Sequence, residues 1–303
     1  MKRMLMVLLA AVLVLSVAAA EEIQNLVEQN GLYGLTDVQG NVVVPCEYEV
    51  LTFNAHIDCY YARKDGKYGV LNVVGETLIP CEWDMLYFTG EDRMHCRVFR
   101  GTLKTNWQNG YSVPDEGLWG LYAIDGTELF SCEWPHMEPA IHGLLVVCKD
   151  GKCGALNLDG EVVVPCNWDG LSVAENGSCI HVFQRISVVD EESVYLEGLL
   201  ALDGTVITPC QWLYISSFSE GLAAVCSEDG YGYINASGEV VVPCQWDWVR
   251  DFSGGYAMVE ENDLWGVIDT TGSLVIPCEW ESLEDLGGGQ FKGTKSSIID
   301  VED

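Results

Sequence analysis

Residues 264–283 have the sequence LWGVIDTTGSLVIPCEWESL, and six other stretches of the chain carry the same pattern. A second glycine follows the first after six residues, a cysteine after twelve and an aromatic residue after fourteen, without insertion or deletion in any copy. Such self-similarity is the signature of a repeat architecture. The cores of the seven copies are residues 31–48, 66–83, 117–134, 151–168, 195–212, 229–246 and 263–280.

Each copy predicts three or four short strands. In the sixth, YGYIN alternates apolar with small or polar residues, ASG predicts a tight turn, and EVVVP predicts a valine-rich strand ended by proline. YAMVEEN predicts a third strand, and WDWV a short fourth. No helical periodicity competes, so the chain is expected to be all-β. One unit cannot bury its own apolar faces, so neighbouring units must pack on each other.

The number of copies favours a closed ring. Seven units suit a β-propeller-like ring, which hides its strand edges by closure. The steps between successive repeat cysteines are 35, 51, 34, 44, 34 and 34 residues, whereas a propeller blade usually takes about 40–45. An open β-solenoid or superhelical array is therefore the alternative.

Three positions of the repeat have local expectations. The first glycine is expected to let the backbone approach the next unit closely. The repeat cysteine is expected to be a small buried apolar residue. The residue between the cysteine and the aromatic is always an acid or an amide, which either bonds a neighbouring N–H group or faces solvent.

The copies resemble the WG-repeat family of bacterial proteins. Its hallmark is a Trp/Tyr-Gly pair, a short hairpin, and an apolar strand that ends in proline, a partner residue and an aromatic. Residues 67–86, KYGVLNVVGETLIPCEWDML, show all of these elements. The third copy departs with Ser131 in the proline place, and the fifth lacks the aromatic-glycine pair. The resemblance implies a β-repeat fold and interaction roles, and it supplies no catalytic residues.

Residues 1–20 have the pattern of a secretory signal peptide. Two basic residues precede an apolar run from Met4 to Val17, and Ala18 to Ala20 supply the small residues of a cleavage site. The alternative is a membrane anchor, but the run is short for a bilayer span of about 20 residues. We therefore expect a secreted protein that is not inserted in a membrane after cleavage.

The charge of the chain is strongly acidic. Without residues 1–20, 13 basic residues face 46 acids, a formal net charge of −33. Such a surface repels nucleic acid and anionic membranes. It suits plain solubility or, alternatively, cationic partners or weakly held Ca²⁺, although no D-x-D-x-D-G loop is present. No cofactor and no metal site are expected.

Thirteen cysteines raise the question of disulfides. Cys148 and Cys153 flank an Asp-Gly turn in CKDGKC, where they can face each other across a hairpin, so they are the one predicted pair. Cys59, Cys96 and Cys179 lie on predicted third strands and are expected in the core.

Two insertions fall at the same point of the repeat, between the third strand and the next hairpin: residues 100–117 and 184–198. Insertions at one point of a repeat emerge on one face, which is often the binding face. Within the first insertion, an aromatic residue with amide neighbours suits a sugar ring or a peptide. The candidate binding residues are Asn106, Trp107, Gln108 and Tyr111. The alternative is a mobile or merely extended hairpin.

Catalysis is not expected. The five histidines follow no motif, and G-x-S-x-G, H-E-x-x-H and phosphate-binding loops are absent from the sequence. The acids recur at equivalent repeat positions, which favours a structural role. The sequence thus favours an exported module that binds a protein or a glycan. The alternatives are a glycan-active hydrolase with paired carboxylates and a structural component of the envelope.

Overall fold

The computed structural model describes residues 23–91, 93–106, 112–189 and 192–295. These residues form strands, turns and bends and contain no helix, which confirms the all-β prediction. Accordingly, no membrane-spanning helix is found among them. The chain divides into two compact units, residues 1–149 with 156–162 and residues 150–155 with 163–303.

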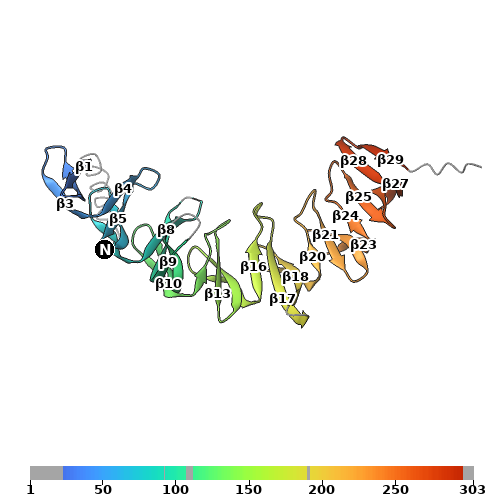
Figure 1. Cartoon of the computed structure of the whole chain (residues 1–303), viewed down its shortest axis with the longest axis horizontal. Helices are drawn as coiled ribbons and strands as arrows, with labels where there is room; N and C mark the ends of the chain where they lie inside the picture. The colour runs from blue at the N-terminus through green and yellow to red at the C-terminus, as the bar shows by residue number, and fades with distance from the viewer. Residues whose placement is uncertain (1–22, 92, 107–111, 190–191, 296–303) are drawn as a thin grey trace, which may run out of the picture. The chain divides into compact units, whose positions relative to one another are not determined.

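The first unit contains a three-stranded sheet β1-β2-β3 and two four-stranded sheets, β4-β5-β6-β7 and β11-β10-β9-β8 (Figure 1). Two further strands, β12 and β13, follow. The strands are β1 (Ile23–Gln29), β2 (Leu32–Asp37), β3 (Val42–Tyr48), β4 (Val50–Asn54), β5 (Cys59–Lys64), β6 (Lys67–Asn72), β7 (Thr77–Trp83), β8 (Met85–Thr89), β9 (His95–Thr105), β10 (Ser112–Ala123), β11 (Glu128–Trp134), β12 (His136–Met137) and β13 (Leu144–Lys149).

The second unit contains the four-stranded sheets β16-β17-β18-β19, β20-β21-β22-β23 and β24-β25-β26-β27, and the two-stranded sheet β28-β29. The division between the units falls within β14 and β15. The strands are β14 (Lys152–Asn157), β15 (Val162–Trp168), β16 (Gly170–Val173), β17 (Ile180–Val189), β18 (Glu192–Leu200), β19 (Val206–Trp212), β20 (Tyr214–Ile215), β21 (Leu222–Ser227), β22 (Gly230–Asn235), β23 (Val240–Trp246), β24 (Trp248–Val249), β25 (Tyr256–Glu261), β26 (Leu264–Asp269), β27 (Leu274–Trp280), β28 (Ser282–Gly287) and β29 (Gln290–Thr294).

Each four-stranded sheet takes its strands from two sequence repeats. The short strand and the third strand of one copy pair with the hairpin of the next copy, as in β24-β25-β26-β27. The cores lie between successive sheets. One cluster joins Tyr233, Val242 and Trp246 of the β20–β23 sheet to Val249 and Ile268 of the β24–β27 sheet. Neighbouring repeats therefore bury each other's apolar faces, as the repeat pattern predicts.

The first glycine of the repeat serves its own hairpin, so the expectation that it approaches the next unit was wrong. The pairing of β22 with β23 shifts register between Tyr231 and Tyr233, because the strand with the Pro-Cys pair carries extra residues there. A Cβ added at Gly232 would lie 2.4 Å from the Val242 carbonyl oxygen and 2.8 Å from the Cys244 nitrogen. Glycine is needed because this bulge leaves no room for a side chain.

The turn glycine makes the close approach between sheets. Gly238 has a φ of +80°. A Cβ added there would lie 2.1 Å from the carbonyl oxygen of Ile207 in the preceding sheet. Gly126 and Gly204 have the same relation to Leu78 and Val163 of the preceding strands. These three hairpin turns thus rest directly on the backbone of the neighbouring sheet, whereas the Gly75 and Gly272 turns meet valine side chains.

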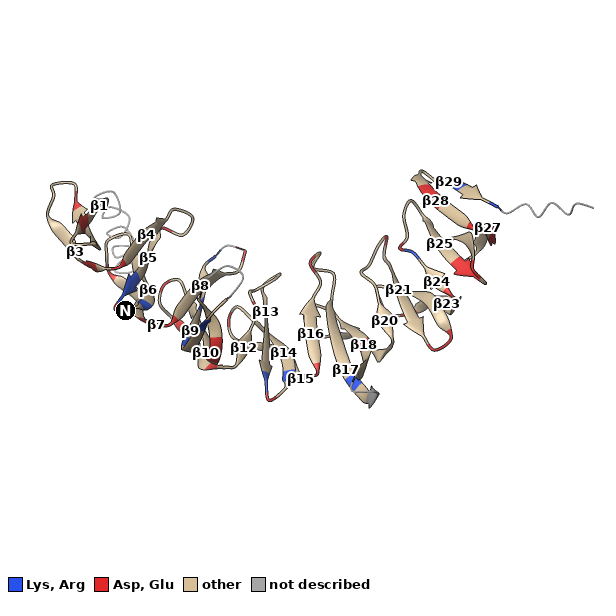
Figure 2. Ribbon diagram, in the orientation of Figure 1, with Lys and Arg blue, Asp and Glu red and all other residues tan. Residues whose placement is uncertain are grey.

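Acidic residues hold the turns of the repeat. The acid after the repeat aromatic accepts the N–H group of the turn that follows the third strand, as Glu49 does from Gly66 and Asp247 from Asn262. Glutamates one place before the aromatic pair with the basic residue that ends the next third strand, as Glu47 does with Lys64 and Glu279 with Lys295. Their side chains are exposed, so the solvent-facing alternative holds for these two. Figure 2 shows acidic residues in both units.

The repeat cysteines lie at the rim of the core. The structure places them as half-buried residues with free thiols. The Cys46 and Cys210 Sγ atoms approach the carbonyl oxygens of Val27 and Val182, at 3.7 and 3.5 Å. They are therefore less buried than expected, and these two side chains extend across the neighbouring strand to the one beyond it. Cys59, Cys96 and Cys179 are fully buried, as predicted.

Candidate functional site

The candidate residues from the first insertion lie mostly outside the described part of the chain. The insertion lengthens the hairpin of β9 and β10, which have 11 and 12 residues. Asn106 follows β9 and is half-buried. Trp107, Gln108 and Tyr111 lie outside the described residues. The second insertion likewise lengthens the hairpin of β17 and β18.

Cys148 and Cys153 are both disulfide-bonded, while the other eleven cysteines are free. That the two are bonded to each other stays the prediction of the sequence. Peptide mapping under non-reducing conditions tests it, because a single linked peptide that contains both residues is expected.

The described chemistry concentrates where one sheet meets the next, which we call a joint. At each joint we compare one residue of the third strand. It is the residue that pairs with the position four places after the repeat aromatic. We call it the joint residue. In the register of the sheets this residue is Tyr61, Arg97 and His181 at three joints. At two later joints, continuing the register by one residue from the neighbouring pair gives Ala224 and Met258.

Arg97 closes its joint with a buried guanidinium group. Its Nη1 donates to the carbonyl oxygen of Met137 on the next short strand, at 2.7 Å. The guanidinium carbon lies 5.1 Å from the ring centre of Trp119 and 5.8 Å from that of Tyr87. Burial lowers the pKa of Arg97 to about 10, so the group stays charged at neutral pH.

Tyr61 fills the preceding joint in the same way. Its hydroxyl donates to the carbonyl oxygen of Leu86, at 3.4 Å, and its ring stacks on Tyr68 with centres 5.3 Å apart. Leu86 and Met137 both lie three residues after their repeat aromatics. The donor side chain differs, but the acceptor is the same backbone position.

The joint of the fifth copy is built from His181 and Glu197. Glu197 replaces the aromatic residue of the repeat, and its Oε2 accepts the N–H group of Ile215 at 3.1 Å. The His181 Nδ1 lies 4.0 Å from the same oxygen. Burial lowers the pKa of His181 and raises that of Glu197, while the bond from Ile215 opposes the latter shift.

We expect His181 to make the protein less stable in mild acid. Because its pKa is lower in the folded state than the ordinary 6.5, the unfolded chain takes up the proton first, and stability falls as the pH drops through 6.5. The loss of thermal unfolding temperature between pH 7.5 and 5.5 should be smaller in His181→Gln than in the wild type. The exposed His56, substituted in the same way, serves as control. Equal losses in His181→Gln and the wild type would contradict the assignment.

The next joint holds a pocket at its surface, while the buried Tyr233 bridges its interior and donates its hydroxyl to the Arg250 carbonyl oxygen. Ala224 takes the place of Arg97, and a pocket of about 280 Å³ lies between the β20–β23 sheet and β24. Its walls carry Tyr214, Tyr231 and Trp248, and the charged residues Arg250 and Asp251 complete it. Trp248 and Tyr214 are 48% and 47% exposed, and the Tyr231 and Trp248 rings lie 4.8 Å apart. The pocket thus offers aromatic surface to solvent.

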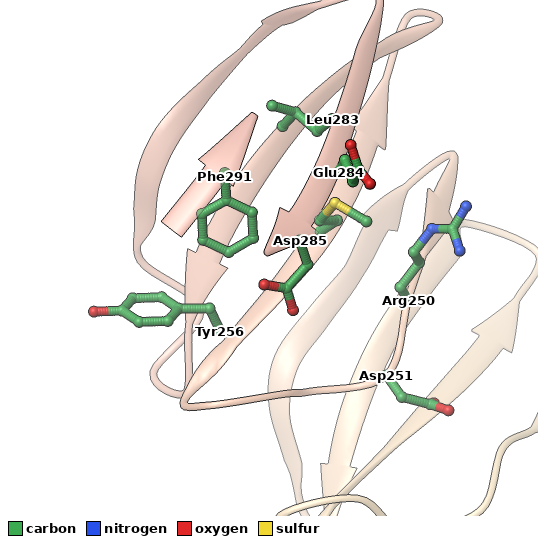
Figure 3. A pocket seen from close by; sticks show the side chains of 8 residues that line it. Arg250, Asp251, Tyr256, Leu283, Glu284, Asp285 and Phe291 are labelled. Atoms are coloured by element: carbon green, nitrogen blue, oxygen red, sulfur yellow. The ribbon is translucent and has the colours of Figure 1, made fainter. Parts of the chain in front are cut away.

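A second pocket adjoins the first, because Arg250 and Asp251 line both. Its volume is about 380 Å³, and it lies between the β24–β27 sheet and the β28–β29 hairpin. Figure 3 shows Glu284 and Asp285 on β28, and Arg250 with Asp251 on the segment that follows β24. Phe291 and Tyr256 meet edge to face with ring centres 6.1 Å apart. Acids and aromatic rings therefore line both pockets.

Sequence reasoning did not find these pockets. The signal is present in the third strands, where a small residue, Ala224, stands in the place of Tyr61, Arg97 and His181. The register of the sheets is needed to align Arg97 and His181 with the others, because the insertions separate them from their repeat glycines. Among the described residues, no group of three or more His, Cys, Asp or Glu side chains is arranged to hold a metal ion.

Part of the repeated chain is similar to a known family. The model of the family described as "WG containing repeat" matches residues 33–68, 202–230, 231–265 and 265–289. This match confirms the resemblance that the repeated phrases predict. A comparison with curated proteins finds no match.

The solved structures that are similar to this chain share little of its sequence. A structure titled "Crystal structure of the eukaryotic initiation factor" covers 87% of this chain and 75% of its own, with 9% identity and a TM-score of 0.36. Kluyveromyces lactis Hsv2 covers 74% of both chains, with 11% identity and a TM-score of 0.24. The N-terminal domain of Nup159 covers 80% of this chain and 84% of its own, with 10% identity and a TM-score of 0.29. Similarity at this level leaves the closed ring and the open array both as predictions.

Proposed function

We propose that this chain is a non-catalytic interaction module that holds a segment of a partner protein in the two adjoining pockets of its second unit. The observation that carries this proposal is the pair of pockets that share Arg250 and Asp251 and are lined by aromatic and acidic side chains. Aromatic residues that are half exposed at the mouth of a pocket are the usual anchors of protein recognition. We propose export with it, on the strength of residues 1–20.

A segment rather than a small ligand is favoured by the spacing of the pockets. One joint follows the other along the repeats, and the two residues common to both lie between them. An extended segment can place successive side chains in successive pockets. The acidic composition of the chain favours a segment that carries positive charge.

The binding test uses the purified chain on a peptide array and a glycan array in parallel. We expect peptide hits whose affinity falls by about 2 kcal/mol or more in Trp248→Ala, as for a central aromatic anchor. Leu213→Ala is the control, because Leu213 is 44% exposed and is not among the residues that line the pockets. Hits that Trp248→Ala leaves unchanged would contradict this site.

The hairpin tip predicted from the sequence is a second candidate surface. The same arrays test it with Trp107→Ala, because loss of glycan or peptide hits in that variant alone would move the binding site to Asn106, Trp107, Gln108 and Tyr111. An absence of hits on both arrays would contradict the interaction module and favour the structural role at the envelope. Hydrolysis of an arrayed glycan would favour the hydrolase.

A further inference from the structure

We propose that the pocket beside Ala224 takes the guanidinium group of an arginine side chain from the partner protein. This inference rests on the proposed function and names the chemistry that the first pocket recognises. It is carried by a comparison within the molecule, since an equivalent joint of the first unit is filled by an arginine of the chain itself.

Arg97 is the internal counterpart of the proposed guest. Arg97 pairs with Tyr87 in its sheet. Ala224 pairs with Ser216 in the same way, because the Ser216 N–H donates to the Ala224 carbonyl at 2.9 Å. The third strand and its neighbour are thus in the same register at both joints. The pair Ser216 and Ala224 lacks the two large side chains of Tyr87 and Arg97. Tyr233, which pairs with Ala224 where Leu121 pairs with Arg97, fills part of this space, and the pocket is what remains.

The acceptor for a guanidinium group is also in place. Val249 lies three residues after Trp246, as Met137 does after Trp134, and it lines the pocket. The backbone N–H of Arg250 donates to the Met258 carbonyl oxygen at 3.0 Å. Hydrogen-bonded and non-hydrogen-bonded pairs alternate in an antiparallel ladder, so the Val249 carbonyl points away from β25. At the joint of Arg97, the equivalent carbonyl of Met137 accepts the guanidinium.

An aromatic wall completes the match. Trp119, which stacks on Arg97, is the aromatic residue before the repeat glycine, and Tyr231 holds that place beside Ala224. Trp248 packs against Tyr231 and lines the same pocket. A planar cation stacks on such rings and bonds at its edge, whereas a lysine ammonium group lacks the plane and the fork of donors.

One carboxylate, Asp251, and one guanidinium group, Arg250, line the pocket. The negative charge of Asp251, together with the larger effect of burial, raises the pKa of both Tyr214 and Tyr233, so this carboxylate acts on the β20–β23 sheet. The guanidinium of Arg250 lies 5.5 Å from the ring centre of Trp265, which belongs to the next joint. Asp251 is therefore available to pair with an incoming guanidinium group.

The test titrates the full chain with three short peptides, Ac-Gly-X-Gly-amide, in which X is arginine, lysine or citrulline. Changes in the NMR signals of the Trp248 indole report on binding. We expect the arginine peptide to bind at least about tenfold more tightly than the other two, since citrulline lacks the charge and lysine lacks the bidentate plane. Equal affinities for arginine and lysine would overturn the proposal, because the acidic surface alone would explain them.

Two substitutions locate the binding. Ala224→Arg should fill the pocket as Arg97 fills its joint and abolish binding of the arginine peptide. Asp251→Asn conserves shape, guards against a folding defect in the first variant, and should weaken binding about tenfold through the loss of one charge-assisted pair. Leu213→Ala should leave binding unchanged. Binding that survives both Ala224→Arg and Asp251→Asn would overturn the proposal.

The outcomes also separate this inference from the proposed function. Array hits that depend on Trp248 but contain no arginine would keep the interaction module and overturn the arginine site. If array hits depend on Trp248 but the arginine peptide does not bind, the interaction module is likewise kept and the arginine site is overturned. An arginine peptide that binds and competes with the hits supports both.

Discussion

Gly238→Ala is expected to lower the free energy of unfolding by about 3 kcal/mol or more, the sum of a left-handed backbone cost and an overpacking cost. The φ of Gly238 is +80°, a region that alanine occupies only with strain. The new Cβ would also lie 2.1 Å from the Ile207 carbonyl oxygen, a backbone atom that cannot turn aside. The turn and the preceding sheet would have to separate.

Urea unfolding measures this loss, and Gly221→Ala is the matched control. Gly221 has nearly the same φ, +81°, in the same unit, but a Cβ added there would have no atom within 4 Å. We expect that variant to lose only about 1 kcal/mol, the cost of the backbone conformation. Similar losses in the two variants would show that the contact between the turn and the neighbouring sheet contributes little.

Arg97→Ala is expected to destabilise the first unit by about 3–4 kcal/mol, the range for breaking a buried polar network and opening a cavity. The substitution removes the donor to the Met137 carbonyl and the guanidinium group that lies against the Trp119 and Tyr87 rings. The Met137 carbonyl would lose this buried bond, which costs more than an exposed group would.

Arg97→Met separates volume from charge. Replacing a buried charged group by an apolar one of similar size is often tolerated. We therefore expect Arg97→Met to lose less than about 1.5 kcal/mol in urea unfolding, the limit usually seen for volume-conserving changes. An equal loss in the alanine and methionine variants would assign the stability of the joint to the hydrogen bond instead of the filled space.

The joints connect stability with recognition. Tyr61 and Arg97 close two joints of the first unit with donors to a backbone carbonyl, and Glu197 closes one of the second unit by accepting an N–H group. At Ala224 the same position carries only a methyl group beside a pocket with exposed aromatic rings, and Tyr233 donates to the Arg250 carbonyl instead. Under the proposed function, one geometry would serve two purposes, since a filled joint stabilises neighbouring sheets and the pocket beside Ala224 would receive a ligand.

The sequence alone determined the repeats and their local structure. The phrase that recurs at seven places sets the hairpins, because a turn glycine can adopt a positive φ and the apolar strand ends at proline. It also predicted the short fourth strand at Trp248 and Val249 and the burial of Cys59, Cys96 and Cys179. These features depend on residues close together in the chain, so local chemistry is sufficient to specify them.

The tertiary structure decided which atoms each repeat residue meets. The first glycine was assigned to the wrong neighbour, because the bulge that crowds Gly232 arises in the paired strand and depends on its register. The equivalence of Arg97 and Ala224 likewise appears only when third strands are aligned through their pairing with the short strands. A pocket such as that beside Ala224 is made by residues from two sheets, and its existence depends on how those sheets pack.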